Sequence, residues 1–441
     1  MDERTRYVRL SNERWLRKLK RKGKLHNPLG RTVDGGIRKA LGYRSRILDL
    51  FCKLPVKGKK KGPPKKIDLP SDFSISRNPD ETLRVMREIV KHARTCRAPR
   101  LILDHRPIIS MGLGADSLLG VILKEVKFEN QDAKGSYIRG YKSDRRNIRK
   151  IMDEIGCVSV LNSGYDENIR LSLQSSSQVF RHRNRGKVLE IDPLQLDPIS
   201  ETTRDFSDHL DACLALIGRK LTRKGRDRLL SYVGEVLINA QEHSGTAEWT
   251  IAGYIDREDQ ELVYRCVIFS FGASISDTFN SLSTDTQAWK TVEPYIFRHE
   301  KSRLFGPSWR RDDLLTVVAL QGHVSSKLDE NSSRGQGTVD LIQFFQDVSG
   351  ECGNSEPRPA MNLISGTTSI IFDGRYPMRH VESFGRMVIA FNKDNNLLER
   401  PDGDCVRPVR GEGFPGVMIS ITVPLAHESV GFLSPEAKNE N

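Results

Sequence analysis

The stretch that decides the fold is Asp227–Gly245, DRLLSYVGEVLINAQEHSG. At about 100° per residue, apolar side chains fall on one face of a helix; they are Leu229, Val233, Val236, Leu237 and Ala240. Glu235, Asn239 and Glu242 fall on roughly the opposite face, with His243 at its edge. A carboxylate and an amide one turn apart suit a hydrated magnesium ion, and a carboxylate beside water can act as a general base. An ordinary amphipathic helix with a solvated polar face remains the simpler alternative from spacing alone.

The residues in the second half of this helix also resemble a known sequence motif. Glu235-Val-Leu-Ile-Asn239-Ala240, followed by Glu242-His243-Ser244, resembles the N box of the GHKL ATPases. That superfamily includes gyrase, MutL, the sensor histidine kinases and the anti-sigma-factor kinases. The resemblance implies that Glu235 polarises the attacking water, that Asn239 holds Mg²⁺ and that His243 lies in the nucleotide site.

A second match follows a predicted hairpin of strands 248–255 and 262–271. The run Phe269-Ser-Phe-Gly-Ala-Ser-Ile275 stands where the family has Asp-x-Gly-x-Gly, whose aspartate accepts a hydrogen bond from adenine. Ser270 takes the aspartate position and Gly272 matches, so the resemblance implies nucleotide contacts there. A serine accepts without the added strength of a charged partner. Asp277 is a candidate substitute.

A third match is Ser332-Ser-Arg-Gly-Gln-Gly-Thr338, which resembles the second glycine box and opens a helix. Glycines let the backbone approach a phosphate, and a helix N-terminus adds oriented N–H groups. The resemblance assigns phosphate binding to Arg334, Gly335, Gly337 and Thr338; a loop glycine pair before a core helix is the alternative. Residues 276–334 would form an irregular lid whose cations are candidates to reach a phosphate: His299, Lys301, Arg303, Arg310, Arg311 and Lys327.

The predicted fold class is α/β, with an ATPase domain of the GHKL sandwich type over residues 195–425. A helix over 203–220 precedes the N box, and runs at 362–366, 367–372 and 413–424 are typical of closing strands. Residues 374–412 interrupt them as an insertion, 166–194 form a connector, and 426–441 form a disordered tail.

Residues 70–165 predict a smaller α/β module, because short apolar strands alternate with helical segments. The string LILDHRPIISMGLGADSLL, residues 101–119, resembles the STAS domains of anti-anti-sigma factors. In those domains a loop before a helix carries a phosphorylatable serine. Ser110 matches it, but the neighbouring aspartate is missing and Met111 stands beside the glycine. The module is therefore interpreted as a protein-interaction or regulatory domain.

The excess positive charge lies in one terminal segment. Residues 1–66 hold 22 Lys+Arg and 5 Asp+Glu, whereas the other residues hold 48 and 52. Dense cations with aromatics between them are typical of a nucleic-acid-binding arm. A solvated tail, or an arm for an acidic protein partner, is the alternative. The candidate contacts are Arg14, Trp15, Arg17, Lys18, Lys20, Arg21, Lys22, Lys59, Lys60 and Lys61.

Composition narrows the class of protein. A chain of 441 residues has room for two or three domains. Its 7 cysteines stand singly, with no CxxC pair, which argues against a disulfide framework or a zinc site and favours a reducing compartment. No apolar run has the length of a membrane span and no signal-peptide core is present, so a soluble, cytoplasmic protein is expected.

Three functions follow as hypotheses. The favoured one is a Mg²⁺-dependent ATPase that acts as a nucleotide-controlled conformational switch, with nucleic acid on the basic arm and an ATP-dependent homodimer as a further expectation. The second is an anti-sigma-type protein serine kinase, with the STAS-like module as its substrate or partner. The third is a degenerate, non-catalytic nucleic-acid-binding scaffold.

Overall fold

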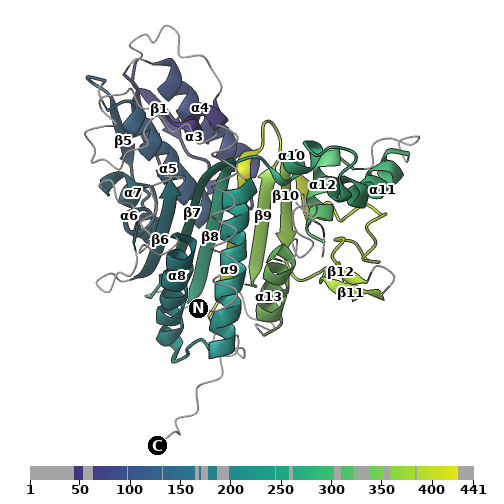
Figure 1. Ribbon diagram of the computed structural model, residues 1–441. Coiled ribbons are helices and arrows are strands. Elements are labelled where there is room, and N and C mark those ends of the chain that lie inside the picture. Colours follow the sequence, from purple (N-terminus) through teal and green to yellow (C-terminus); the bar gives the residue numbers. More distant parts are fainter. Residues whose placement is uncertain are drawn as a thin grey trace, which may run out of the picture.

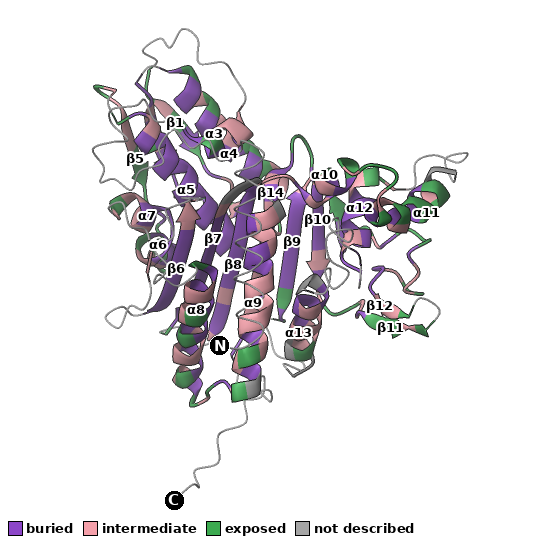
Figure 2. Ribbon diagram, in the orientation of Figure 1, coloured by how far each residue is buried: buried purple, intermediate pink, exposed green. Residues whose placement is uncertain are grey.

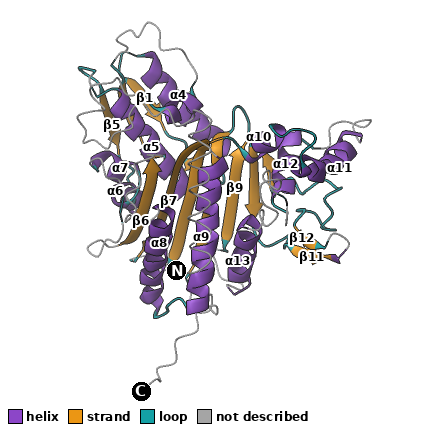
Figure 3. Ribbon diagram, viewed as in Figure 1, coloured by secondary structure: helices purple, strands orange, loops and turns teal. Residues whose placement is uncertain are grey.

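The structure, a computed structural model, describes residues 44–425 except 53–62, 97, 132, 164–167, 170–176, 186–197, 244, 258–261, 302–308, 322–323, 325–336, 352–357 and 383–384. Helices and strands are mixed throughout, which confirms the α/β class (Figure 1, Figure 3). In the described part of the chain, no helix combines the length and apolar character that crossing a membrane requires.

A seven-stranded sheet organises the described residues, and every pair of neighbouring strands in it is antiparallel. In spatial order its strands are β13 (Val406–Pro408), β10 (Thr368–Phe372), β9 (Ala360–Gly366), β14 (Phe414–Pro424), β8 (Val263–Gly272), β7 (Gly245–Asp256) and β6 (Ser177–Arg185). The strands expected at 248–255, 262–271, 362–366, 367–372 and 413–424 all lie in this sheet.

One face of the sheet carries three helices: α8 (Pro198–Leu214), α9 (Arg223–His243) and α13 (Gly337–Glu351) (Figure 1). A short 3₁₀ turn, Ala215–Ile217, joins α8 to the segment before α9. The predicted apolar face of α9 packs here, because Leu229, Val233, Val236 and Leu237 are buried and Ala240 lies against the same core. The helix therefore sits on the sheet in the orientation that its periodicity predicts.

The opposite face of the sheet is also covered, by α3 (Arg46–Phe51) and α5 (Leu113–Glu129). Strand β8 shows the consequence, since Cys266 and Ile268 belong to the core under α9 while Val267 and Phe269 belong to the core under α5. A strand buried on both faces has no polar side to alternate with, which explains its continuous apolar run. Figure 2 shows the central strands almost wholly buried.

The N-terminal module has its own parallel sheet, in the order β1 (Lys65–Asp68), β3 (Arg100–Asp104) and β5 (Tyr137–Tyr141). A two-stranded parallel pair, β2 (Asp72–Phe73) with β4 (Ser110–Met111), precedes α5. Its other helices are α4 (Pro79–Thr95), α6 (Arg146–Glu154) and α7 (Cys157–Asn162). Because α5 packs on both this module and the large sheet, the two share one hydrophobic core.

Two predicted boundaries differ from the structure. The expected arm, residues 1–66, includes α3, whose Ile47, Leu48 and Phe51 are buried, and β1 begins at Lys65. Residues 1–43 and 53–62 lie outside the described residues. The expected connector, 166–194, contains β6, which pairs with β7 along its whole length. Its buried residues include Arg181, His182 and Arg183. The strand is therefore buried although its sequence is polar, which explains why the sequence did not predict it.

The segment expected to be an irregular lid, and the expected insertion, both contain helices or strands. Within the predicted lid lie α10 (Ile275–Asn280), α11 (Gln287–Lys301) and α12 (Arg311–Ala319). Within the predicted insertion lie the hairpin of β11 (Arg379–Val381) and β12 (Arg386–Val388), and the edge strand β13. Val317, Val318, Val388 and Phe391 are almost fully buried, so the burial of apolar side chains explains the order of both segments. The predicted tail, 426–441, lies outside the described residues.

Candidate functional site

The candidate site is built on α9, the helix of the N-box-like string. Glu235 and Asn239 are half-buried, on the side of α9 away from its core-facing stripe. Tyr232 lies three and seven residues before them, positions that share one side of a helix. Its ring packs against Phe344 of α13, with ring centroids 5.5 Å apart. The polar pair therefore lies along the side of α9 that faces α13.

Ser270 lies on the same face of the sheet as α9. It stands directly opposite Trp249 in the β7–β8 pair, and opposite residues of an antiparallel pair point to one face. Trp249 donates its indole N–H to Oε1 of Gln241 on α9, at 3.3 Å. The expected base-recognition position thus lies on the sheet face that carries the helix of the expected magnesium position. Ser270 itself is only 4% exposed.

Gly416 of β14 lies directly against the Ser270 carbonyl. It sits at a β-bulge of β14 with φ of 144°, and a β-carbon there would overlap the Ser270 carbonyl. A side chain at this position would push β14 away from β8 beside Ser270.

The loop after β8 is fixed by a capping box. The Ser274 hydroxyl accepts from the Asp277 N–H at 3.1 Å, and Asp277 Oδ2 accepts from the Ser274 N–H at 3.0 Å. This arrangement satisfies two N–H groups at the start of α10. Asp277 is therefore used for helix capping through Oδ2, while its substitution for the adenine-binding aspartate stays a prediction. Gly272, with φ of 130°, closes the strand before this loop.

Three cations of the predicted lid are engaged in structural contacts. The Arg310 guanidinium binds both oxygens of Asp313, at 2.8 and 2.9 Å, and donates to the Thr367 carbonyl at 2.5 Å. The hydrogen bond to Asp313 raises the pKa of Arg310, which keeps this guanidinium charged. Arg311 donates to Asn280, and the His299 ring contacts the Leu397 carbonyl. These contacts stabilise the packing of α11 and α12 against neighbouring segments.

Several predicted residues have no described side-chain geometry. Arg334 and Gly335 lie outside the described residues, as do Arg303, Lys327 and all ten residues of the predicted nucleic-acid arm. Gly337 and Thr338 form the first turn of α13, and His243 ends α9; the structure defines their backbone only. The helix expected to start at the stretch that resembles the second glycine box is therefore present, while its phosphate contacts stay a prediction.

Comparisons with protein-family models, with curated proteins and with solved structures found no match to this chain.

Proposed function

We propose that this chain is an ATP-binding protein of the GHKL type that hydrolyses ATP with Mg²⁺ and changes conformation with its nucleotide state. The observation that carries the proposal is the placement of Glu235 and Asn239, one turn apart and half-buried, along the side of α9 that faces α13. The order of α9, the β7–β8 hairpin, α13 and the closing strands supports it.

The residues of α9 fit a magnesium–nucleotide complex chemically. Magnesium prefers oxygen ligands and keeps several waters, and an amide oxygen on a half-buried helix side meets both needs. Asn239 would hold the ion, which neutralises phosphate charge when bound. Glu235 would orient the attacking water and accept its proton. The α13 N-terminus, with Gly337 and Thr338, would receive the phosphates through its backbone N–H groups.

The basic N-terminal segment supports a second component of the proposal. Its net positive charge stands against a slightly acidic remainder of the chain, so electrostatic attraction to nucleic-acid phosphates would concentrate in residues 1–66. Nucleotide binding would then control how this segment, or the N-terminal module, meets its partner. Binding to DNA or RNA that weakens steeply with added salt is the expected signature.

Calorimetry with Mg²⁺-ATP on the full chain and on Asn239→Ala tests the site. We expect a dissociation constant of about micromolar order for the unaltered chain and at least a tenfold loss in the variant. Asn147→Ala is the matched control, because Asn147 is an exposed asparagine on a different helix, α6. Equal binding by all three proteins, or binding by none, would overturn the proposal.

Turnover separates an ATPase from a scaffold that only binds. Glu235→Gln is expected to retain nucleotide binding and to lose at least a hundredfold in hydrolysis, the usual contribution of a general base. Labelled phosphate from γ-labelled ATP distinguishes the remaining hypotheses. Release to water supports the ATPase, transfer to Ser110 supports the protein kinase, and binding without turnover supports the scaffold.

A further inference from the structure

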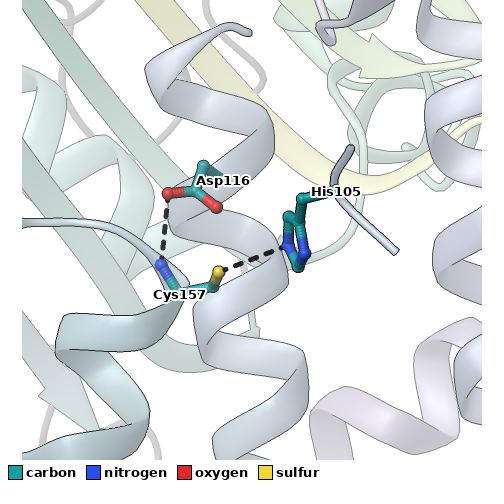
Figure 4. A group of neighbouring side chains, drawn as sticks. All are labelled: His105, Asp116 and Cys157. Atoms are coloured by element: carbon teal, nitrogen blue, oxygen red, sulfur yellow. Dashed lines mark hydrogen bonds between the residues drawn. The ribbon is translucent and has the colours of Figure 1, made fainter. Parts of the chain in front are cut away.

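A cluster unrelated to the α9 site lies inside the N-terminal module. His105 follows β3, Asp116 lies in the first turn of α5, and Cys157 is the first residue of α7. One potential ligand atom from each of the three lies within 4.8 Å of the others. All three residues are buried, with at most 3% of their surface exposed. Figure 4 shows their side chains converging from three separate segments.

Hydrogen bonding orients the histidine for a ligand role. Nδ1 of His105 lies 3.3 Å from the Tyr141 carbonyl oxygen, and a carbonyl only accepts, so Nδ1 carries the proton. The lone pair of the neutral ring is then on Nε2, which lies 3.7 Å from Cys157 Sγ. Metal-bound histidines usually donate their second ring nitrogen to such a carbonyl or to a carboxylate.

The distance between these two atoms matches a tetrahedral zinc site. Zinc binds sulfur at about 2.3 Å and imidazole nitrogen at about 2.0–2.1 Å, so the two ligands of a tetrahedral ion lie about 3.5 Å apart. The observed 3.7 Å between Nε2 and Sγ differs from that edge by about the tolerance expected of a real site. Both atoms can therefore bind one ion with little movement.

Asp116 supplies the observation that separates this cluster from an ordinary cysteine–histidine contact. Its Oδ2 accepts from the Cys157 backbone N–H at 3.2 Å. Its Oδ1 is buried, with no hydrogen-bond partner among the described residues. A buried acceptor without a partner costs about 1–3 kcal/mol, and more if it is charged. A cation between Asp116, His105 and Cys157 would satisfy it.

The backbone beside the Asp116 carboxylate leaves space for it. A β-carbon added at Gly156 would overlap the Asp116 carboxylate, so a glycine is required at the turn between α6 and α7. That requirement places the carboxylate directly against the residue that precedes Cys157. The chain thus brings the aspartate and the cysteine together at the start of α7 rather than keeping the charged group at the surface.

We propose that His105, Asp116 and Cys157 bind a zinc ion that holds the end of β3, the start of α5 and the start of α7 together. A thiolate and a carboxylate balance the two positive charges of the ion, which suits a buried site. Binding displaces the thiol proton. A water or a backbone oxygen would complete the tetrahedron. Closed surroundings are typical of structural zinc, and the proposal does not depend on nucleotide binding.

The same molecule provides a matched control. Cys213 and His209 of α8 form a buried pair with Sγ and Nε2 3.6 Å apart, close to the distance in the cluster. No carboxylate joins this pair to form a three-residue group in the described part of the chain. Cys213→Ser therefore removes a buried thiol beside a histidine without removing a proposed zinc ligand.

The test measures metal content by mass spectrometry on the full chain purified without added metal. We expect about one zinc per chain, retained in Cys213→Ser and lost in Cys157→Ser. The unaltered chain grown with cobalt should show thiolate-to-cobalt charge-transfer absorption in the near ultraviolet. Zinc retained by Cys157→Ser would overturn the proposal, because the ion would then lie elsewhere.

The cobalt measurement keeps the proposal testable even if Cys157→Ser does not fold. An unaltered chain that contains no stoichiometric metal and shows no thiolate-to-cobalt absorption overturns the proposal without any variant. Asp116→Asn provides an independent check, because it preserves the size of the side chain and removes its charge. We expect it to bind zinc at least tenfold more weakly, as measured by competition with a chromophoric chelator.

Discussion

At the scale of single residues, His209 shows how burial converts a common side chain into a pH-sensitive element. It is fully buried in α8, stacked on Phe180 with ring centroids 5.6 Å apart, and its Nδ1 has no hydrogen-bond partner among the described residues. Burial lowers the pKa of His209 to about 3.

This histidine predicts the acid sensitivity of the fold. The pKa of His209 in the folded state lies below the unfolded value of about 6.5. The folded state therefore keeps its full free energy of unfolding above pH 6.5 and loses part of it as the pH falls toward 3. Protonation of the unfolded chain alone should lower the free energy of unfolding by about 2–3 kcal/mol at pH 4.5. Urea unfolding at pH 7 and pH 4.5 should show a smaller loss in His209→Gln. The exposed His380→Gln is the control, and equal losses in all three proteins would contradict this account.

At the scale of elements, segments with a clear apolar pattern were predictable from the sequence, and a buried strand with a polar sequence was not. Helix α9 and strand β8 have clear patterns, so their existence and their buried positions follow from sequence. Strand β6 was missed because Arg181, His182 and Arg183 are buried through partners on other elements. The Arg181 guanidinium donates to the Ile155 carbonyl at 2.6 Å, for instance. No local pattern contains such partners.

The two candidate sites also differ in whether the sequence could predict them. Glu235 and Asn239 were identifiable because they share one helix, where a four-residue spacing fixes their separation. The cluster of His105, Asp116 and Cys157 was not identifiable, because its members are brought together by β3, α5 and α7. Cysteine spacing alone argued against a zinc site. That rule detects paired ligands on one loop and does not detect single ligands that the fold gathers.

The β-bulge in β14 gives a testable prediction about the stability of the fold. Gly416→Ala should lower the free energy of unfolding by about 2 kcal/mol or more, because the new methyl group collides with the Ser270 carbonyl and the backbone is strained. Gly403→Ala is the matched control, since a β-carbon there meets nothing within 4 Å. Denaturant unfolding of both variants measures the difference. Similar stabilities for the two would show that the bulge relaxes freely.

At the scale of the whole molecule, the N-terminal module and the large sheet form one folded unit. Glu125 of α5 and Arg183 of β6 form a buried ion pair, with 2.8 Å between Oε1 and Nη2, and Glu248 of β7 lies 3.9 Å from the same nitrogen. Burial raises the pKa of Glu248 to about 7, despite the opposing charge of Arg183. One arginine therefore compensates carboxylates from both parts of the chain.

Arg183→Met removes this compensation and tests whether the two parts unfold together. Breaking a buried pair usually costs about 3–5 kcal/mol, because the remaining charge stays buried after losing its closest partner; Arg185, 3.8 Å from Glu125, offsets part of this cost. We expect a lower unfolding temperature, and a partial recovery when Glu125→Gln is added. The exposed pair of Arg84 and Glu81 provides the control, since Arg84→Met should change stability by less than about 1 kcal/mol.

Because the two parts share a hydrophobic core, we also expect them to unfold in a single transition. Tryptophan fluorescence reports mainly on the part that contains the large sheet, because Trp249 is buried in β7 and Trp289 and Trp309 pack against the same core. Circular dichroism reports on helices and strands of both parts. Since β8 contributes side chains to both cores, loss of one core exposes the other. The two signals should therefore coincide in the unaltered chain and shift together in Arg183→Met. Separate transitions, with the N-terminal part melting alone, would mean that the contact between α5 and the sheet is a domain interface rather than a common core.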